Sequence, residues 1–202
     1  MNLFLISALG YLLGSIPFGY LIARVAGGSD IRQTGSGNIG ATNVARTLGL
    51  GAGVLTLLLD AGKGALAVWL AGRYGHGVAS PLVFAGVAAI LGHLFPVWLK
   101  FHGGRGVATA IGVFLMIGWI AVVVDLVVWV VAMIVWRYAS LSSMLWAAAL
   151  PLLMYWLYAP GLHPPPEISV GTVLAAILIL WRHRENMRRL VEGTEPRMRF
   201  RH

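Results

Sequence analysis

The chain has 202 residues, of which 58% are hydrophobic and 11% are charged, and its mean hydropathy is +0.81. This composition lies far outside the range of soluble globular proteins and predicts one integral membrane domain with short loops. The absence of cysteine excludes disulfides, thiolate nucleophiles and thiolate metal sites. The net charge of +8 does not indicate a nucleic-acid partner, because cytoplasmic loops of membrane proteins are enriched in lysine and arginine.

In chain order, the long apolar segments predict membrane-spanning helices, since about 20 apolar residues cross the hydrocarbon core. Five such segments cover about 2–24, 48–71, 79–100, 141–159 and 167–182. The first has no basic residue before Arg24, so we expect a transmembrane helix there and not a cleaved signal peptide. The apolar stretch 106–136 is long for one helix and short for two, so the count is six or seven.

The distribution of basic residues favours seven helices. Thirteen of the fifteen lysines and arginines lie in 24–46, 100–105, Arg137 and the tail from Arg182 onward. The positive-inside rule puts all four segments in the cytoplasm only if 106–136 crosses the membrane twice. We therefore expect an all-α integral membrane protein of about seven transmembrane helices, with its N-terminus outside and its C-terminus cytoplasmic. A re-entrant element within 106–136 is the alternative.

Cytoplasmic loops are where a chain of this kind can carry chemistry. In the single polytopic domain expected for residues 1–202, these loops cover about 29–47, 100–109, 137–143 and 183–202. Two GxxxG spacings, in GYLLG and GLGAG, predict close helix packing elsewhere in the chain. The glycines concerned are Gly10, Gly14, Gly49 and Gly53.

Three cytoplasmic segments hold the polar residues expected of a binding site. They are GSGNIGATNVAR (Gly35–Arg46), GHLFPVWLKFHGGRGVAT (Gly92–Thr109) and HRENMRRLVEGTE (His183–Glu195), named here the first, second and third motifs. Glycine-rich backbone can approach an anion closely, and arginine suits phosphate oxygens. One such loop alone is better explained as a flexible connector, but two on the same side of the membrane, with Arg46 and Arg105, favour an anion site.

The helices that follow these motifs add to this prediction, because a helix N-terminus carries positive charge. We expect Thr42 or Asn43 to cap the helix after the first motif, and Gly106 to open the helix after the second. Neither motif is a Walker A sequence or a dinucleotide fingerprint.

The acidic residues exclude several classes of enzyme. They number seven and are scattered, so no aspartate pair suits Mg²⁺, and HExxH, GxSxG and a histidine five residues before an aspartate are all missing. We therefore expect anion chemistry without a metal or a cofactor.

Two charges lie within predicted helices. Asp60 and Lys63 are three residues apart and share a helix face, so both a structural ion pair and a functional role stay open. Asp125 has no assignment from sequence. His93 and Pro96 are expected to end or kink their helix.

Taken together, the three motifs resemble those of the bacterial membrane acyl-phosphate:glycerol-3-phosphate acyltransferases, the PlsY type. The resemblance runs from GSIPFGYLIAR, at Gly14 to Arg24, through nearly the whole chain. It implies transfer of a fatty acyl group from acyl phosphate to the 1-hydroxyl of glycerol 3-phosphate, giving lysophosphatidic acid and phosphate for phospholipid synthesis. One position differs: the family's second motif usually reads FKGGKG, whereas this chain has FHGGRG, with His102 in place of a lysine.

The resemblance also implies a set of site residues and a location. The catalytic set is Ser36, Asn38, Thr42, His183 and Asn186. The substrate-binding set is Gly35, Gly37, Gly40, Arg46, Gly103, Gly104, Arg105, Ser140 and Ser143. The implied partners are glycerol 3-phosphate, acyl phosphate and membrane lipid. The implied location is the bacterial cytoplasmic (inner) membrane, with a multi-pass chain and its active site on the cytoplasmic side.

Several alternatives stay open at this point. Direct attack of the glycerol hydroxyl needs a base, which is either His183 or a phosphate oxygen of the substrate. An acyl-CoA donor is separated from acyl phosphate only by the resemblance. A small anion or lipid transporter is the alternative from another class, although transporters tend to have repeats and a site at mid-membrane.

Overall fold

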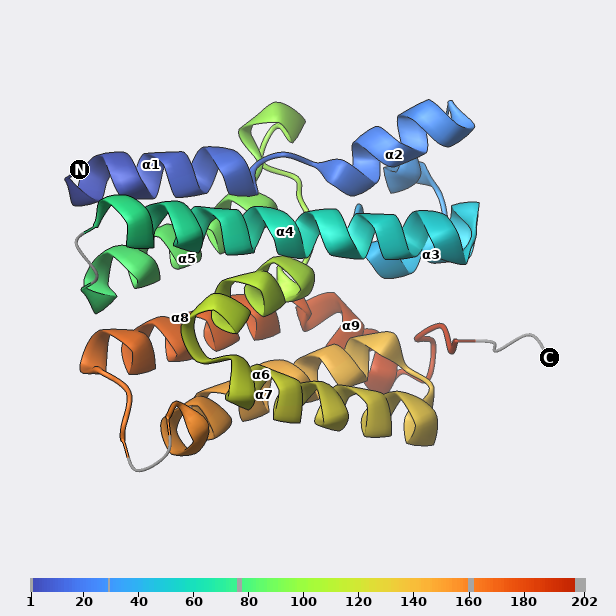
Figure 1. Cartoon of the computed structure of the whole chain (residues 1–202). Helices are drawn as coiled ribbons and strands as arrows, with labels where there is room; N and C mark the ends of the chain where they lie inside the picture. Colours follow the sequence, from blue (N-terminus) through green and yellow to red (C-terminus); the bar gives the residue numbers. More distant parts are fainter. Residues whose placement is uncertain (1, 29, 76–77, 160–161, 199–202) are drawn as a thin grey trace. The chain divides into compact units, whose positions relative to one another are not determined.

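The structure, a computed structural model, describes residues 2–28, 30–75, 78–159 and 162–198, and the regular elements within them are helical (Figure 1). These elements are α1 (Leu3–Gly14), α2 (Phe18–Gly27), η1 (Ile31–Gln33), α3 (Ala41–Leu48), α4 (Leu50–Tyr74), α5 (Ala79–Leu94), η2 (Val97–Leu99), α6 (Val107–Trp136), α7 (Ala139–Leu157), α8 (Pro166–Arg182) and α9 (Arg184–Val191). The predicted all-α class is confirmed.

Five described segments are long and apolar enough to cross a membrane. They are Leu3–Gly27, Leu50–Tyr74, Ala79–Leu99, Val107–Trp136 and Ala139–Leu157. The predicted span 167–182 corresponds to α8, which has 17 residues. The predicted boundaries therefore agree with the observed helices to within a few residues for α4, α7 and α8.

Two predicted helices are interrupted. The segment 2–24, expected to be continuous, breaks between α1 and α2, because Pro17 lacks the N–H that a helix interior requires. Within α6 the backbone of Gly118 is not helical, with φ −154° and ψ 71°. The apolar stretch 106–136 is thus one kinked element in the described chain.

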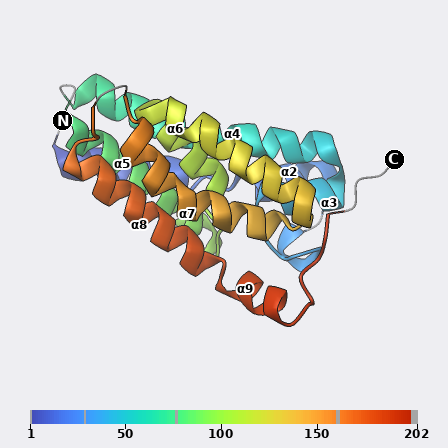
Figure 2. The same ribbon diagram turned by 90° about the horizontal axis from the view of Figure 1, so that it is seen from below.

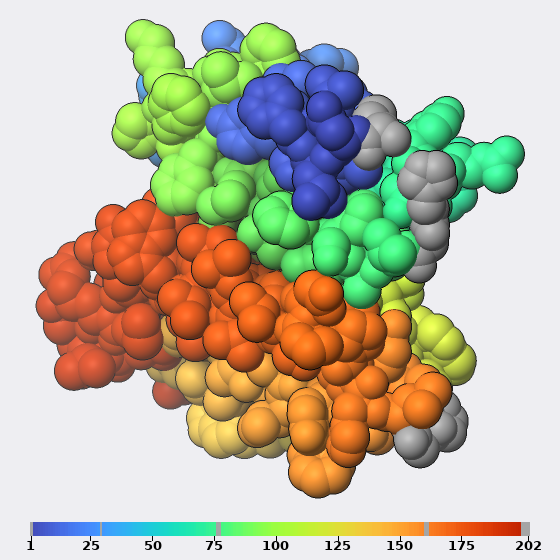
Figure 3. Space-filling model, turned by 90° about the vertical axis from the view of Figure 1, so that its left-hand side faces the viewer, coloured from blue at the N-terminus to red at the C-terminus, as the bar shows by residue number. Residues whose placement is uncertain are grey.

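The chain forms two compact units, Met1–Ile117 and Gly118–His202. In the first unit α1, α4 and α5 lie side by side, and α2 and α3 pack against α4 (Figure 1). The N-terminal end of α1 lies directly against α5 (Figure 3). In the second unit α7 packs along α8, and α9 contacts both (Figure 2). Asp125 of α6 is fully buried in this unit.

Close packing of small residues was predicted from the two GxxxG spacings, and three of the four glycines confirm it. A Cβ atom on Gly10 or Gly14 would collide with the backbone of α5, and one on Gly53 would collide with Ala45 of α3. Gly49 differs, since it has open space around it and a φ of +96°. Its role is to turn the chain between α3 and α4, where a residue with a Cβ is strained.

Candidate active site

The first motif is organised by one buried amide side chain, that of Asn43. Its Nδ2 atom donates to the backbone carbonyls of Ile31, Thr34 and Asn38 at 2.9–3.2 Å. Its Oδ1 accepts from the N–H of Ser36 at 2.8 Å. Asn43 is 1% exposed, so these bonds are shielded from water and fix the shape of the loop.

Two glycines of the first motif have left-handed backbone conformations. Gly35 has φ +58° and Gly37 has φ +69°, which residues with a Cβ adopt only with strain. At Gly35 a Cβ would also collide with Asn43 Oδ1. The sequence predicted a cap role for Asn43 or Thr42, and this is wrong, because α3 begins at Ala41 with Gly40 at its N-cap.

The other candidates in the first motif lie at its surface. Ser36, Asn38 and Thr42 are half-buried and Arg46 is exposed. Thr42 and Arg46 are four residues apart on α3, so they share one helix face. Asn38 also accepts the N–H of Gly40 at 3.4 Å through its side-chain oxygen.

The second motif folds back on the end of α5 through its two adjacent glycines. The N–H of Gly103 donates to the Leu94 carbonyl at 3.2 Å, and the N–H of Gly104 donates to the His93 carbonyl at 3.0 Å. A Cβ on Gly104 would occupy the place of the His93 ring, and one on Gly103 would collide with the His93 carbonyl and Pro96. Arg105, half-buried, follows directly.

Five amides of these two motifs donate within the loops. They belong to Ser36, Gly37, Gly40, Gly103 and Gly104. These five N–H groups are therefore engaged within the protein. As predicted, Gly106 opens the next helix: it has φ +88°, and α6 begins at Val107. Donors for a ligand must therefore come from the N-terminus of this helix and from polar side chains.

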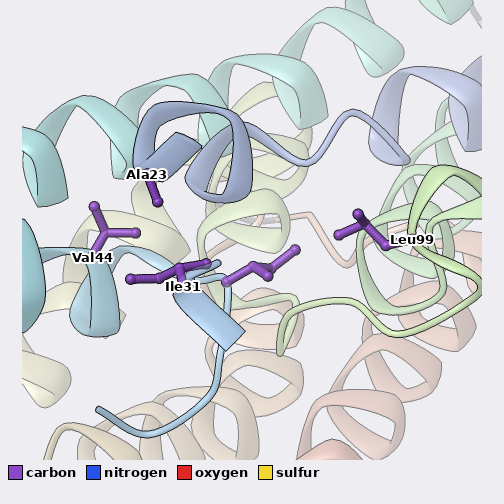
Figure 4. Close-up of a cluster of buried hydrophobic side chains, with 5 residues drawn as sticks. Ala23, Ile31, Val44 and Leu99 are labelled. Carbon is purple, nitrogen blue, oxygen red and sulfur yellow. The ribbon is translucent and has the colours of Figure 1, made fainter. Parts of the chain in front are cut away.

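One cluster of buried apolar side chains supports both motifs. It contains Ala23 of α2, Ile31 of η1, Ile39 and Val44 of the first motif, and Leu99 of the second. Figure 4 shows Val44 and Ile31 below Ala23 of α2, with Leu99 at the opposite end of the cluster. The structure therefore brings Arg46 and Arg105, predicted on separate loops, onto elements that share one core.

In the third motif the helix breaks at His183. The predicted span ends at 182, and in the structure α8 ends at Arg182 and α9 begins at Arg184. His183 is 1% exposed, and its Nδ1 lies 2.8 Å from the Ile179 carbonyl. A carbonyl can only accept, so Nδ1 carries the hydrogen and Nε2 is the acceptor nitrogen of the neutral ring.

Glu195 connects the remaining candidates of the second unit, a role that the sequence did not indicate. Its Oε1 accepts from Ser140 Oγ at 2.6 Å and from Asn186 Nδ2 at 2.7 Å, and its Oε2 accepts from Arg189 Nε at 2.8 Å. Burial raises the pKa of this carboxyl, but the bonds from Ser140, Arg189 and Asn186 outweigh it and lower the pKa below its ordinary value.

Ser140 and Ser143, predicted together as substrate-binding residues, have different surroundings. Ser140 joins Asn186 through Glu195, whereas Ser143 Oγ accepts from Trp129 Nε1 of α6 at 3.2 Å. Ser143 therefore takes part in helix packing.

Asn186 shows an acceptor that the fold leaves without a partner. Because its Nδ2 donates to Glu195, its orientation is fixed. Its buried Oδ1 has no hydrogen-bond partner in the described part of the chain. An unpaired buried acceptor is costly, so this oxygen is suited to receive a donor from a ligand.

Comparison with known proteins agrees with these features. A family model described as glycerol-3-phosphate acyltransferase matches residues 4–193. A glycerol-3-phosphate acyltransferase of Mesorhizobium japonicum is 46% identical over 197 residues, covering 98% of this chain and 96% of that protein. One of Rhodopseudomonas palustris is 48% identical over 190 residues, covering 94% and 93%.

Solved structures give the same result. This chain resembles the crystal structure of PlsY, an integral membrane glycerol 3-phosphate acyltransferase, in its glycerol 3-phosphate form, with a TM-score of 0.91 and 38% identity. The match covers 98% of this chain and 96% of that one. The lysophosphatidic acid form of PlsY gives a TM-score of 0.88 at 36% identity. The chain therefore belongs to the PlsY-type family of integral membrane glycerol-3-phosphate acyltransferases.

Proposed function

We propose that this chain transfers a fatty acyl group from acyl phosphate to the 1-hydroxyl of glycerol 3-phosphate, releasing lysophosphatidic acid and inorganic phosphate. The observation that carries the proposal is the shared core of the first and second motifs, the two segments that carry Arg46 and Arg105. Both substrates present phosphate oxygens, and arginine binds these in a bidentate manner. Family membership supports acyl transfer over transport.

In this proposal the first unit holds phosphate and the reacting carbonyl. Arg46 and Arg105 bind phosphate groups, while the half-buried polar side chains of Ser36, Asn38 and Thr42 orient the substrates and stabilise the developing oxyanion. Acyl phosphate contains a good leaving group, so direct attack by the glycerol hydroxyl needs no covalent enzyme intermediate.

The third motif orients the acceptor alcohol. The Asn186 Oδ1 is an acceptor without a partner in the described residues, because Nδ2 of the same side chain donates to Glu195. In the neutral ring of His183, Nε2 is an acceptor by its chemistry, because Nδ1 carries the hydrogen. Acceptors repel a phosphate anion and attract a hydroxyl hydrogen. We therefore assign this pair to the hydroxyls of glycerol 3-phosphate, with Ser140 acting through Glu195.

The proton of the attacking hydroxyl passes to a phosphate oxygen of the substrate in the mechanism that we favour. The alternative base is His183 Nε2. Replacing His183 with glutamine keeps an acceptor of similar reach, so substrate assistance predicts that turnover falls but persists. If His183→Gln abolishes turnover while glycerol 3-phosphate still binds, His183 is the base and substrate assistance is wrong.

The membrane arrangement that we propose is one polytopic domain with seven crossings, the N-terminus outside and the C-terminus cytoplasmic. The kink at Gly118 supports it by dividing α6 into two legs, and α8 supplies a further short crossing. This arrangement puts thirteen of the fifteen basic residues on the cytoplasmic side of a bacterial inner membrane. Cysteine labelling in intact cells at exposed positions such as Arg24 and Val78 tests it.

The central experiment measures phosphate release by purified protein from palmitoyl phosphate, with and without glycerol 3-phosphate. We expect release that depends on glycerol 3-phosphate, is absent with palmitoyl-CoA as donor, and is strongly reduced in Arg46→Ala. Arg46 is exposed on α3, so the variant is expected to fold, which thermal unfolding checks. Transfer from palmitoyl-CoA with release of CoA would contradict the donor, and no transfer from either donor would contradict the reaction.

A further inference from the structure

A buried cluster of three ionisable side chains lies within the first unit and takes no part in the reaction proposed above. Asp60 and Lys63 form the ion pair that their spacing predicts, with Lys63 Nζ 2.8 Å from Asp60 Oδ1. The third member is His93, whose Nδ1 lies 3.0 Å from Lys63 Nζ and 3.6 Å from Asp60 Oδ1. All three side chains are at most 3% exposed.

The Lys63 ammonium has three N–H donors, and three acceptors surround it. Besides Asp60 and His93 it reaches the backbone carbonyl of Ile16 at 2.7 Å. This carbonyl lies in the break between α1 and α2, beside Pro17, where regular helical hydrogen bonding is interrupted. An ammonium cannot accept a hydrogen bond, so His93 Nδ1 must be the acceptor, and the ring hydrogen is on Nε2.

From Ile16 the chain continues into α2, which packs against the first motif. A Cβ on Gly19 would collide with the backbone carbonyl of Ile39, so α2 and the first motif are in backbone contact there. Ala23, one turn further along α2, belongs to the apolar cluster beneath that motif. The position of the break at Ile16 therefore determines where the first motif is supported.

The other end of the cluster reaches the second motif. The His93 ring fills the space that a Cβ of Gly104 would need, and Gly104 donates its N–H to the His93 carbonyl. Arg105 is the next residue. The orientation of the His93 ring, which Lys63 determines, therefore decides where the backbone that carries Arg105 can lie.

We propose that Asp60, Lys63 and His93 are positioning residues that hold the first and second motifs, which bind phosphate, in fixed positions relative to each other. Lys63 joins the α1–α2 break, which supports the first motif, to the His93 ring, which supports the second. Asp60 compensates the charge and orients the ammonium. The inference rests on the proposed function, because it assumes that these motifs hold the substrate phosphates.

A purely stabilising role explains the cluster less well. Burying three ionisable groups costs desolvation free energy, and apolar side chains of similar volume are often equally stable. Ionisable groups inside membrane helices are retained where they serve function, and the best-established use of a buried ion pair is to fix one geometry. Here Lys63 of α4 connects two other backbone segments, the α1–α2 break through the Ile16 carbonyl and α5 through His93, while Asp60 of its own helix pairs its charge.

Two variants of similar shape test the connection through Lys63. In His93→Leu the acceptor for Lys63 is lost, whereas in His93→Asn the Oδ1 atom replaces the Nδ1 acceptor. Thr172→Val serves as the matched control, because its buried hydroxyl donates to the Ile168 carbonyl of its own helix and the change removes one buried hydrogen bond. A further variant, Asp60→Asn combined with Lys63→Met, removes both charges together. It takes the place of His93→Leu in the test if His93→Leu does not fold.

The readouts are the KM values for both substrates, kcat, and the rise in the thermal midpoint that glycerol 3-phosphate produces. We expect His93→Leu to raise both KM values by about tenfold or more, since small displacements of positioned groups have large effects. The midpoint rise should shrink correspondingly. His93→Asn should recover most of the wild-type KM values, and Thr172→Val should change the midpoint but neither KM.

Two results would overturn the proposal. If His93→Leu lowers the midpoint but keeps wild-type KM values, the cluster is structural only. If His93→Leu and His93→Asn share the same raised KM values, Lys63 plays no part in positioning. The rise in thermal midpoint produced by glycerol 3-phosphate needs no acyl donor. This measurement therefore tests the inference even if acyl phosphate proves not to be the donor.

Discussion

The first and second motifs are both glycine-rich and both carry an arginine, but they are built differently. In the first, one side chain, Asn43, binds three backbone carbonyls and one N–H of the loop around it. In the second, the two adjacent glycines pack directly on His93.

The glycines accordingly serve two purposes. Gly35 and Gly37 are required for their positive φ angles, and Gly35 also because Asn43 Oδ1 leaves no room for a Cβ, whereas Gly103 and Gly104 are required only because neighbouring atoms leave no room for a side chain. A substitution in the first motif therefore strains the backbone, and one in the second displaces a neighbour. Four substitutions, in these motifs and directly before the first, test how each motif is held.

The largest effect is expected for Gly104→Ala. The added methyl group would collide with the His93 ring, which the buried ion cluster prevents from moving aside. Overpacking of this kind costs about 1–3 kcal/mol of stability, and displacement of Arg105 should lower kcat/KM by about 100-fold. Steady-state kinetics and thermal unfolding measure the two effects. Wild-type kinetics in this variant would show that the second motif is not held by contact with His93.

The next largest effect is expected for Asn43→Asp, which keeps the shape of the side chain but loses its amide donors. Three backbone carbonyls, of which that of Ile31 is in a buried bond, then face a carboxylate, and a lost donor costs about 1–3 kcal/mol in a buried site. We expect a lower unfolding midpoint together with loss of activity. Thr47→Val on the same helix is the control, since the Thr47 hydroxyl only bonds its own helix at the Asn43 carbonyl.

A smaller effect on stability is expected for Gly40→Ala. This glycine has φ −76°, and a Cβ there would lie 3.4 Å from Asn38 Nδ2, an ordinary contact distance. The loss at the N-cap is about 1 kcal/mol or less. Because packing tolerates the methyl group, a marked rise in KM would report close approach of a substrate to this backbone. Unchanged KM values would remove Gly40 from the substrate-binding set.

The smallest effect concerns the acidic residue before the first motif. The side-chain hydrogen bond from Arg32 to Asp30 lowers the pKa of that carboxyl from 3.8 to about 2. A lowered pKa means that the interaction stabilises the fold above pH 3.8 and is lost as the pH falls toward about 2. As the pH is lowered between these two values, the unfolding midpoint of the wild type should fall slightly more than that of Asp30→Asn. If the midpoints of both proteins change equally with pH, the pair does not stabilise the first motif. The expected difference is small because both side chains contact solvent.

The sequence predicted features that depend on local chemistry. Apolar length located the spanning segments, and spacing located the Asp60–Lys63 pair. The break before α2 could also have been predicted, because proline at position 17 disfavours a helical conformation of the residue before it. The predicted helix nevertheless continued through this position.

Features that depend on distant contacts were missed. Glu195 lies 55 residues from Ser140, and neither segment contains a pattern that predicts their hydrogen bond. The His93 ring was expected only to end a helix, because its contact with Lys63 joins residues 30 positions apart. The role of Asn43 needs a loop shape that no periodic pattern encodes.

The apolar cluster beneath the two motifs also has a thermodynamic consequence. Since Val44 and Leu99 pack in one core, a substrate that orders one motif reduces the freedom of the other (Figure 4). The second substrate then loses less conformational entropy on binding than the first. Linkage requires the effect to be reciprocal, so each substrate should strengthen binding of the other by the same factor.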